Sequence, residues 1–373
     1  MTPGTLPRRL CPNTNTFHAE DIVSAQLALF ADASVPRKRR PRRIHPSVPQ
    51  APTTTVPTAL LRSADWILLN SSGGKDSQSM ASHVCRLAAK LGLLHRVVIV
   101  HADLGDVEWS GTRQLAEDQA RRLGVRFEVV QAEGGDLLAR TISRFFKLKA
   151  KAEREAREEG RDPATAKVAP AWPSSAARWC TSDLKRGPIR KLMTRLVAEL
   201  GDLGRPARIL NCMGQRAAES APRAKLAAVE IDRPASNGRR HVTTWRPIHG
   251  WTDAEVWKEI ARSGLPYHEA YDWGMSRLSC SFCVLGCEAD VVLAARLRPK
   301  KAAEYVAVEK KVGADFKHGL SMRQIVERAK ALDTEYGELR RPPRGTALSG
   351  YVGKKATRQY LVRVEQGRLD LAA

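Results

Sequence analysis

The sequence predicts an α/β protein built on a doubly wound, mostly parallel sheet, with a basic and mainly helical C-terminal part. Two observations support this prediction. Apolar runs typical of buried strands alternate with segments whose apolar residues recur at helical spacing. Their order, β-α-β-α-β, implies a parallel sheet with helices packed on its faces. With 373 residues and 43% hydrophobic content, the chain can bury a large core.

The elements of the first half follow from this alternation. Strands and helices are predicted, in chain order, over residues 66–69, 80–91, 96–101, 112–123 and 125–130. Both helices run into a glycine, Gly92 and Gly124, which is a common C-terminal stop signal. The strand at 96–101 is rich in valine, as expected inside a parallel sheet.

The second half is predicted to contain less of the sheet. Residues 137–160 are highly charged and helical, and residues 161–177 form a flexible connection. Alanine-rich helices and one more strand, at 208–212, come next. A capping box of Thr252 and Glu255 then begins a further amphipathic helix.

These patterns divide the chain into three parts. Residues 1–62 contain the run PRKRRPRR and much proline and threonine, so they are predicted to be a disordered basic arm. Residues 63–290 hold the α/β domain and a cysteine cluster, and residues 291–373 form a basic, partly helical extension. The arm is either a tail that binds polyanions or a solvated leader with no role of its own.

The formal net charge of the chain is +22, and a cationic surface of this size concentrates polyanions. We therefore expect a nucleic acid as a partner, although an arginine-rich composition without function would give the same total. No stretch reaches the roughly 20 uncharged apolar residues of a membrane span. The N-terminal MTPGTLPRRLCPN also lacks the apolar segment of a secretory signal. We expect no membrane association, and the cytoplasm is the expected compartment.

The stretch LLNSSGGKDSQSM (68–80) joins the first strand to the first helix. A turn rich in serine and glycine at this place gathers backbone N–H groups and a helix amino end around one point, where a phosphate is well held. A P-loop of the GTPase type is excluded, because Leu69 and Asp76 stand where that motif needs glycine and a hydroxyl residue. The remaining alternative is a plain strand-to-helix turn.

The loop resembles the SGGxDS loop of the PP-loop ATP pyrophosphatase superfamily, whose fold is the adenine nucleotide alpha hydrolase-like type. Four more segments resemble the phosphoadenosine phosphosulfate (PAPS) reductase branch of that superfamily, so the resemblance covers residues 63–290. These are VHADLGDVEWSGT (100–112), RWCTSDLKRGP (178–188), GQRAAESAPRA (214–224) and the run from WRPIHGW to CSFC (245–283). The resemblance implies a loop that grips the β- and γ-phosphates, so that ATP is cleaved between its α- and β-phosphates.

The resemblance also indicates the residues of a nucleotide site. Lys75, Arg216 and Arg223 supply positive charge where a polyphosphate is held. Asp76 or Asp103 is expected to bind Mg²⁺. The candidate catalytic residues are Lys75, Asp76, Arg216 and Arg223. The candidate nucleotide-binding residues are Ser72, Gly73, Gly74, Lys75, Asp76, Ser77, Asp103, Gly214, Arg216 and Glu219. Outside such motifs, a surface salt bridge would explain each charged side chain.

Three of the seven cysteines, Cys280, Cys283 and Cys287, form a C-x₂-C-x₃-C array able to wrap several thiolates around one metal. A zinc ribbon would need a second C-x₂-C pair. Cys180 in the RWCTSDLK segment is the candidate fourth ligand, whereas Cys212 is expected in the core. Members of the PAPS reductase branch carry a [4Fe–4S] cluster near the nucleotide, although their cysteine spacings differ. The resemblance therefore favours this cluster over Zn²⁺ and over cysteines without metal.

Three functions follow from the resemblance. PAPS and adenylylsulfate reductases attack sulfur with a mobile C-terminal cysteine, and the last cysteine of this chain is Cys287. We therefore expect an ATP pyrophosphatase that adenylates DNA or tRNA for sulfur transfer, similar to the PP-loop subunit of DNA phosphorothioation systems. It would need a sulfur donor such as a cysteine desulfurase. The alternatives are a PAPS or adenylylsulfate reductase with an unusual thiol, and a nucleotide-binding component of a nucleic-acid complex that has lost catalysis.

Overall fold

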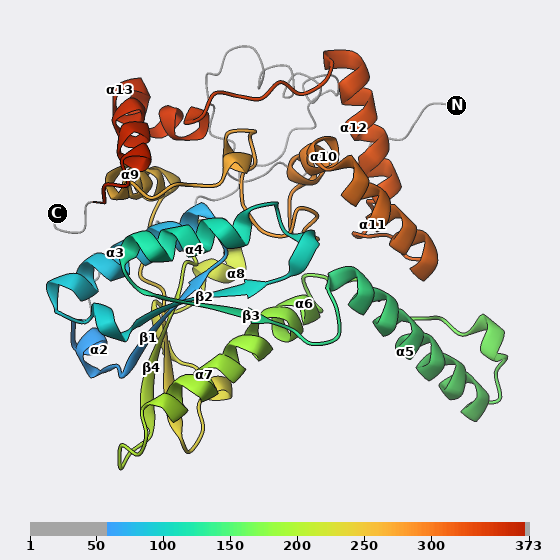
Figure 1. Ribbon diagram of the computed structural model, residues 1–373. Helices are drawn as coiled ribbons and strands as arrows, with labels where there is room; N and C mark the ends of the chain where they lie inside the picture. The colour runs from blue at the N-terminus through green and yellow to red at the C-terminus, as the bar shows by residue number, and fades with distance from the viewer. Residues whose placement is uncertain (1–57, 370–373) are drawn as a thin grey trace, which may run out of the picture.

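The computed structural model describes residues 58–369, and its centre is a six-stranded sheet (Figure 1). The strand order is β3-β2-β1-β4-β6-β5, and all neighbours are parallel except β5 and β6. The predicted α/β fold with a mostly parallel sheet is thereby confirmed. The strands are β1 (Trp66–Ser71), β2 (Val97–Asp103), β3 (Arg126–Gln131), β4 (Ala207–Met213), β5 (Val229–Ile231) and β6 (Arg240–Trp245).

Helices surround this sheet and make up most of the C-terminal part. The helices are α2 (Thr58–Ser63), α3 (Lys75–Lys90), α4 (Thr112–Leu123), α5 (Leu137–Glu158), α6 (Trp179–Thr181), α7 (Gly187–Glu199), α8 (Ala221–Ala224), α9 (Asp253–Ser263), α10 (Glu288–Leu297), α11 (Pro299–Val312), α12 (Met322–Tyr336) and α13 (Thr346–Glu365). The π-helical turn η4 (Ser182–Arg186) joins α6 to α7. The 3-10 turns are η1 (Leu94–Arg96), η2 (Gly105–Val107), η3 (Pro163–Thr165), η5 (Ala217–Glu219), η6 (Arg233–Ala235) and η7 (Glu269–Tyr271).

The first half of the domain agrees closely with the predicted elements. α4 begins and ends at the predicted residues, and Gly124 caps it in the left-handed conformation, with φ at 67°. The capping box of Thr252 and Glu255 is present at the start of α9. α3 begins earlier than predicted, at Lys75, because its polar first turn KDSQS gives no apolar periodicity to detect.

Two strands of the second half were not predicted. All three residues of β5 are exposed, and β6 reads RHVTTW, in which polar residues stand at both strand faces. β6 nevertheless lies in the sheet, because it pairs in parallel with β4 from Arg240 opposite Ala207 to Trp245 opposite Cys212. Tertiary pairing thus outweighs the weak local strand signal.

Both faces of the sheet are covered, as expected for strands that are apolar on both sides. In Figure 1, α3 and α4 lie over one face and α7 lies under the other. Successive side chains of β1 point to opposite faces of the sheet. Ile67 therefore packs with α3 and α4, whereas the neighbouring Leu68 packs with Leu192 and Leu196 of α7.

The predicted basic arm, residues 1–62, lies almost entirely outside the described residues. The structure corrects the end of that arm. Residues 58–62, which were predicted to be disordered, form most of α2. The helix is held because Leu61 is fully buried in the apolar core beneath α3.

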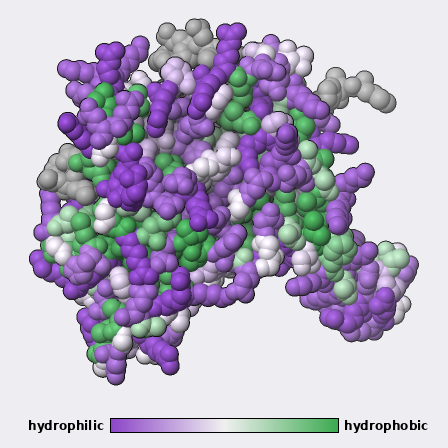
Figure 2. Space-filling model, viewed as in Figure 1, coloured by the Kyte–Doolittle hydropathy of each residue, from purple (hydrophilic) through white to green (hydrophobic). Residues whose placement is uncertain are grey.

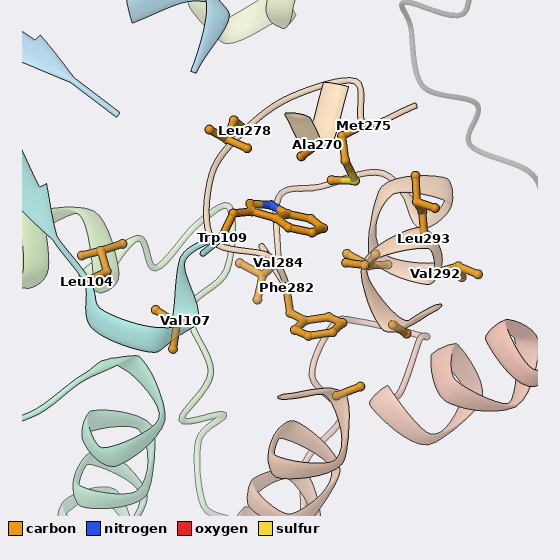
Figure 3. Close-up of a cluster of buried hydrophobic side chains, with 14 of the residues drawn as sticks. Leu104, Val107, Trp109, Ala270, Met275, Leu278, Phe282, Val284, Val292 and Leu293 are labelled. Atoms are coloured by element: carbon orange, nitrogen blue, oxygen red, sulfur yellow. The ribbon is translucent and has the colours of Figure 1, made fainter. Parts of the chain in front are cut away.

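The C-terminal part is helical, as predicted, and α10, α11 and α12 pack together next to the cysteine segment (Figure 1). Phe282 of that segment packs against Tyr305 of α11, with ring centroids 5.0 Å apart. The same hydrophobic cluster contains Trp109 and Leu278 from the α/β domain (Figure 3). The extension and the cysteine segment therefore share one core.

Hydrophilic side chains dominate the face of the molecule seen in Figure 2, with small separate areas of hydrophobic atoms between them. Among the described residues, no helix has the length and apolar character needed to cross a lipid bilayer.

Candidate active site

The site begins where the strand order reverses, between β1 and β4. The strands that follow β1 in the chain lie on one side of it, and those that follow β4 lie on the other side. In such α/β sheets, ligands bind beyond the carboxyl ends of the strands at this point. The side-chain amide of Asn70 joins the two strands, because its nitrogen donates to the Asn211 side chain at 2.7 Å and to the Cys212 carbonyl at 2.9 Å. The loop after β1 and the loop after β4 therefore meet at one place.

The loop after β1 is held in shape by its own short side chains and by one tyrosine. The Ser72 N–H donates to Ser77 Oγ at 3.2 Å, and Ser77 Oγ donates to the Gly74 carbonyl at 2.9 Å. The Lys75 N–H donates to the Tyr271 hydroxyl at 2.9 Å. Gly73 has φ at 69°, a conformation that favours glycine.

The amino end of α3 opens toward the same space. Its N-cap, Gly74, offers no side chain to cap the helix, so first-turn N–H groups remain available to an anion. Gly214, after β4, lies directly against this turn: a Cβ atom there would stand 2.8 Å from the Asp76 carbonyl oxygen and from Ser77 Cα. The close approach of the two loops therefore requires glycine at 214.

Behind the loop lies a buried ion cluster of two cations and two carboxylates. Arg216 Nε donates to Asp76 Oδ1 at 2.5 Å, and Arg216 Nη2 donates to Asp253 Oδ1 at 2.8 Å. Lys75 Nζ lies 3.0 Å from Asp76 Oδ2 and 3.2 Å from Asp253 Oδ1. The Arg216 side chain is fully buried and also donates to the Trp251 carbonyl. The cluster joins α3, the loop after β4 and the start of α9.

The protonation states of this cluster follow from its geometry. Burial alone would raise the pKa of Asp76, but the charges of Lys75 and Arg216 outweigh it and hold this pKa below its ordinary value. Burial likewise opposes the charge on Lys75, and Asp76 overcomes it, so the Lys75 pKa lies above its ordinary value. Lys75, Asp76 and Arg216 are therefore charged near neutral pH.

This cluster shows where three candidate site residues lie. Lys75 and Arg216 are expected to contact the phosphates, and in the structure their side chains pair with Asp76 and Asp253. Their physical role is to fix the first turn of α3 against the loop after β4. Both Asp76 oxygens are also engaged by these cations, which leaves this carboxylate poorly placed to bind Mg²⁺.

The open space is a cavity of about 280 Å³ beyond the carboxyl ends of β1 and β4. The candidate residues that line it are Ser72, Gly74, Asp76, Ser77, Gly214, Glu219, Arg223, Cys180, Cys280 and Cys283. The candidate residues that do not line it are Gly73, Lys75, Asp103, Arg216 and Cys287. The structure thus brings the phosphate-type loop and three of the four candidate metal ligands to a single cavity.

Cationic side chains line much of this cavity. They are Arg178, Lys185, Arg186, Arg190, Arg223 and Arg277. Arg223 pairs with Glu219, and Arg190 lies 3.9 Å from Asp232. Within the described part of the chain, Arg277 makes no hydrogen bond or ion pair, although it is partly buried. Such cations suit a polyanionic ligand.

Three cysteine thiols lie on one side of the cavity. Burial raises the pKa of the Cys280 thiol to about 12, and burial followed by the neighbouring Cys283 raises that of Cys180. The positive charge of Lys185 opposes this rise in both pKa values, because a nearby cation stabilises the thiolate form. Cys287, the fourth candidate ligand, is the N-cap of α10.

The spacing of these thiols bears on which metal they fit. Around a tetrahedral zinc ion, thiolate sulfurs lie about 3.8 Å apart. In the described residues, the one group of three ligand atoms within 4.8 Å of one another is His101, Asp103 and Glu108, and the cysteines do not form such a group. The described cysteines therefore do not stand at the spacing of a preformed tetrahedral zinc site.

The cysteine segment is attached to the segment that follows β2. Glu108 and Cys280 form an isolated antiparallel bridge. Next to it, the Ser281 N–H donates to the Val107 carbonyl at 2.9 Å. Figure 3 shows Val107 and Phe282 on these two adjoining segments. Arg298 closes the junction by donating to the Glu108 carbonyl and to Ser281 Oγ.

Asp103 is the last residue of β2, two residues beyond the predicted end of that strand, and belongs to the group of three possible ligands described above. Its Oδ1 accepts from the Gly105 N–H at 2.8 Å. The two nitrogens of buried His101 face the Ser71 carbonyl at 3.1 Å and Glu108 Oε2 at 3.2 Å. Glu108 also lines the cavity, so this group reaches the open space through Glu108.

Several residues of the site were not predicted. Asp253 belongs to the ion cluster, and its only signal was an acidic residue in the first turn of a capped helix. Tyr271 gives the loop a hydroxyl acceptor, and nothing in its local sequence indicates that role. Lys185 and Arg277 lie within recognised segments, and their charge could have marked them as cavity residues.

A glycine- and serine-rich loop at the reversal point of a mostly parallel sheet is the arrangement of an α/β protein of the PP-loop type. A family model described as the phosphoadenosine phosphosulfate reductase domain matches residues 67–288, and the chain belongs to this family. Members of this family are enzymes. α11, α12 and α13 follow the matched residues.

Individual relatives match smaller parts. An uncharacterized 37.8 kDa protein of Escherichia phage 186 is 29% identical over 150 residues, 40% of this chain and 42% of that protein. An adenosine 5′-phosphosulfate reductase of Neisseria meningitidis is 31% identical over 70 residues, 19% of this chain and 27% of that enzyme. The chain thus spans less than half the length of these relatives.

Two solved structures are also similar to parts of the chain. A PAPS reductase from Candida auris in complex with phosphate has a TM-score of 0.35 at 16% identity, over 60% of this chain and 87% of that one. A U34-tRNA thiolase from Methanococcus maripaludis with its [4Fe–4S] cluster has a TM-score of 0.32 at 13% identity, over 85% of this chain and 81% of that one.

Proposed function

We propose that this chain is an ATP pyrophosphatase that adenylates a nucleic acid for sulfur transfer, with an iron–sulfur cluster held by its cysteines. One observation carries the proposal: the phosphate-type loop and the thiols of Cys180, Cys280 and Cys283 line the same cavity. A nucleotide bound by the loop would have its reactive phosphate next to a sulfur-binding centre. A simple nucleotide-binding protein has no need of this arrangement.

The proposed first step is attack by an oxygen of the acceptor on the α-phosphorus of ATP. The bond from that phosphorus to the bridging oxygen breaks, and pyrophosphate leaves with the electron pair. The first-turn N–H groups of α3 would hold the β- and γ-phosphates, with Arg223 and Lys185 offsetting the developing charge. A sulfur nucleophile from the donor then displaces AMP from the acceptor.

Magnesium is proposed to bind on the side of the cavity formed by β2. Mg²⁺ prefers one or two carboxylates together with phosphate oxygens and water. Glu108 lines the cavity, and Asp103 offers an oxygen within 4.8 Å of it. Asp76 also lines the cavity, but its two oxygens are paired with the cations Lys75 and Arg216.

The cysteines would hold a [4Fe–4S] cluster. When bound, such a cluster transfers electrons if all its irons carry thiolates, or binds sulfide at an iron that lacks one. Cys180, Cys280 and Cys283, which line the cavity, would be ligands, whereas Cys287 is disulfide-bonded in the structure and would supply no thiolate in that state. The positive charge of Lys185 beside the thiols supports an anionic centre.

The acceptor and the sulfur donor follow from charge and chemistry. The chain carries +22, and cations line the cavity, which favours DNA or tRNA as acceptor. A persulfide-forming enzyme such as a cysteine desulfurase would supply sulfur. The thiolase of similar fold acts, by its description, on U34 of tRNA.

The test is product analysis with anaerobically purified protein, ATP, Mg²⁺ and either DNA or tRNA. We expect pyrophosphate and AMP. Lys185→Gln, in the cavity, should lower pyrophosphate release roughly tenfold or more. Lys191→Gln is the matched control, because Lys191 lies on the exposed side of α7 paired with Glu133. Formation of ADP would contradict the proposal. ATP binding without turnover on any acceptor would instead favour a component that has lost catalysis.

A second candidate is a PAPS or adenylylsulfate reductase. It is favoured by the family itself and by the similarity to the Neisseria meningitidis enzyme. In this case the cavity would hold the sulfonucleotide, and Cys180 would be the unusual thiol. Sulfite formed from either nucleotide with thioredoxin as reductant, and lost in Cys180→Ser, would establish this activity. Absence of sulfite with both nucleotides would eliminate it.

A further inference from the structure

Tyr305 is a buried polar side chain that the proposed function does not use. It lies on α11, which follows the residues matched by the family model. Its side chain has no solvent exposure, and its hydroxyl has no hydrogen-bond partner within the described residues. Buried hydroxyls almost always have a partner, so this one requires an explanation.

Aromatic rings surround Tyr305 and orient it. Trp172 stacks on it with centroids 5.8 Å apart and planes at 11°, and Phe316 meets it edge-on at 5.7 Å. On the side of the cavity, Phe282 lies 5.0 Å away. Phe282 stands between Cys280 and Cys283 in the chain and lines the cavity with them. Tyr305 is thereby held against the cysteine segment.

The other buried tyrosines show what this position lacks. Tyr267 donates to Asp272 at 2.6 Å, and Tyr360 donates to the Leu265 carbonyl at 2.8 Å. Two charged groups lie near Tyr305, but both are engaged elsewhere: Asp136 accepts from the Ala139 N–H, and Arg298 pairs with Asp106. A phenylalanine would fill the same aromatic cage without leaving an unpaired hydroxyl.

The Tyr305 hydroxyl can act toward anionic sulfur only as a donor. A phenol ordinarily titrates at about pH 10, so it carries its proton at neutral pH.

We propose that Tyr305 donates a hydrogen bond to sulfur of the metal centre bound by Cys280 and Cys283, either a cysteine thiolate or an inorganic sulfide. The inference rests on the proposed cluster and adds a residue from outside the matched domain to its surroundings. A hydrogen bond to sulfur withdraws electron density from it and stabilises the reduced state, so it raises the reduction potential. Tyr305 is a positioning residue in this scheme, since it passes no proton to substrate.

The test compares Tyr305→Phe with wild type in the full chain, purified anaerobically with its cluster. Redox titration followed by electron paramagnetic resonance should show a more negative midpoint potential in the variant. Electron-nuclear double resonance in D₂O should show the loss of one exchangeable proton coupling. Tyr360→Phe is the matched control, because it removes an equally buried hydroxyl that is bonded to Leu265. Its potential should equal that of wild type.

The outcomes separate this inference from the proposed function. Wild-type protein without iron and sulfide would refute the cluster itself. A cluster in wild type, with unchanged potential and proton coupling in Tyr305→Phe, would overturn only the role of Tyr305. Selective loss of iron from Tyr305→Phe, with circular dichroism unchanged and iron retained in Tyr360→Phe, would support the contact, because only a group at the centre affects retention in this way.

Discussion

The two ends of the cavity differ in how far the protein satisfies its own polar groups. At the loop end, Ser72, Ser77 and the Lys75 N–H all have partners, and Arg216 is paired with both carboxylates behind the loop. At the cysteine end, the Tyr305 hydroxyl has no hydrogen bond within the described part of the chain. The loop end is thus organised by hydrogen bonds and ion pairs of the protein itself, whereas the buried Tyr305 hydroxyl at the cysteine end has no such partner among the described residues.

If this contrast is correct, breaking the ion cluster should have the largest effect on stability. Arg216→Met leaves Asp76 and Asp253 buried without their main counter-charge, which should lower the free energy of unfolding by about 3–5 kcal/mol. Denaturation in urea measures the loss. Arg208→Met is the control, since Arg208 is exposed on β4, and it should change little. Equal stability of both variants would show that the loop end is not held by its ions.

A smaller loss is expected from crowding the contact between the two loops. The Cβ atom of Gly214→Ala would overlap backbone atoms of Asp76 and Ser77, which should cost about 1–3 kcal/mol and weaken ATP binding. Gly250→Ala meets nothing within 4 Å and serves as its control. Calorimetric titration measures the affinity for ATP, and denaturation measures the loss of stability. Normal ATP affinity in Gly214→Ala would argue against nucleotide binding at this loop.

The ion cluster also predicts how stability depends on pH. The Asp76 pKa is lowered in the folded state, so its ionised form stabilises the fold above the ordinary carboxyl pKa, and this contribution disappears as pH falls through the folded value. Asp76→Asn should therefore flatten the stability profile between about pH 5 and pH 2. Asp65→Asn removes a more exposed pair with Arg205 and should flatten it less. The opposite ranking would contradict the assignment.

The cysteine end should show the smallest effect on the metal-free protein. Cys280→Ser and Cys283→Ser should each change the unfolding free energy by about 1 kcal/mol or less, because the thiols have little to lose without metal. The same variants should lose iron and sulfide after anaerobic reconstitution. Cys85→Ala, a core thiol of α3, should keep both. Full iron content in the serine variants would remove these cysteines from the list of ligands.

The part of the molecule that sequence predicts well is the part built by local rules. α4 ends at Gly124 and α9 begins at the Thr252 capping box, since these signals lie within a few residues of what they control. β5 and β6 were not predicted, because β6 is placed by pairing with β4 and β5 by pairing with β6, and not by their own sequence patterns.

The site shows the same division. The sequence located the loop and the cysteines, because each is a contiguous motif. It did not show the direction of Lys75, which depends on where α3 begins and on the presence of Asp253 at the start of α9. The surroundings of Tyr305 could not be predicted from the sequence either, because its neighbours Trp172 and Phe282 come from distant segments.

The bridge between Glu108 and Cys280 has a consequence for regulation. It ties the segment beside the nucleotide cavity to the first cysteine of the array, so a ligand that moves one must move the other. By thermodynamic linkage, any change that ATP makes in the affinity for the metal centre is matched by an equal change that the metal centre makes in the affinity for ATP. If ATP and a metal centre bind as proposed, loss of the centre would therefore change the affinity for ATP.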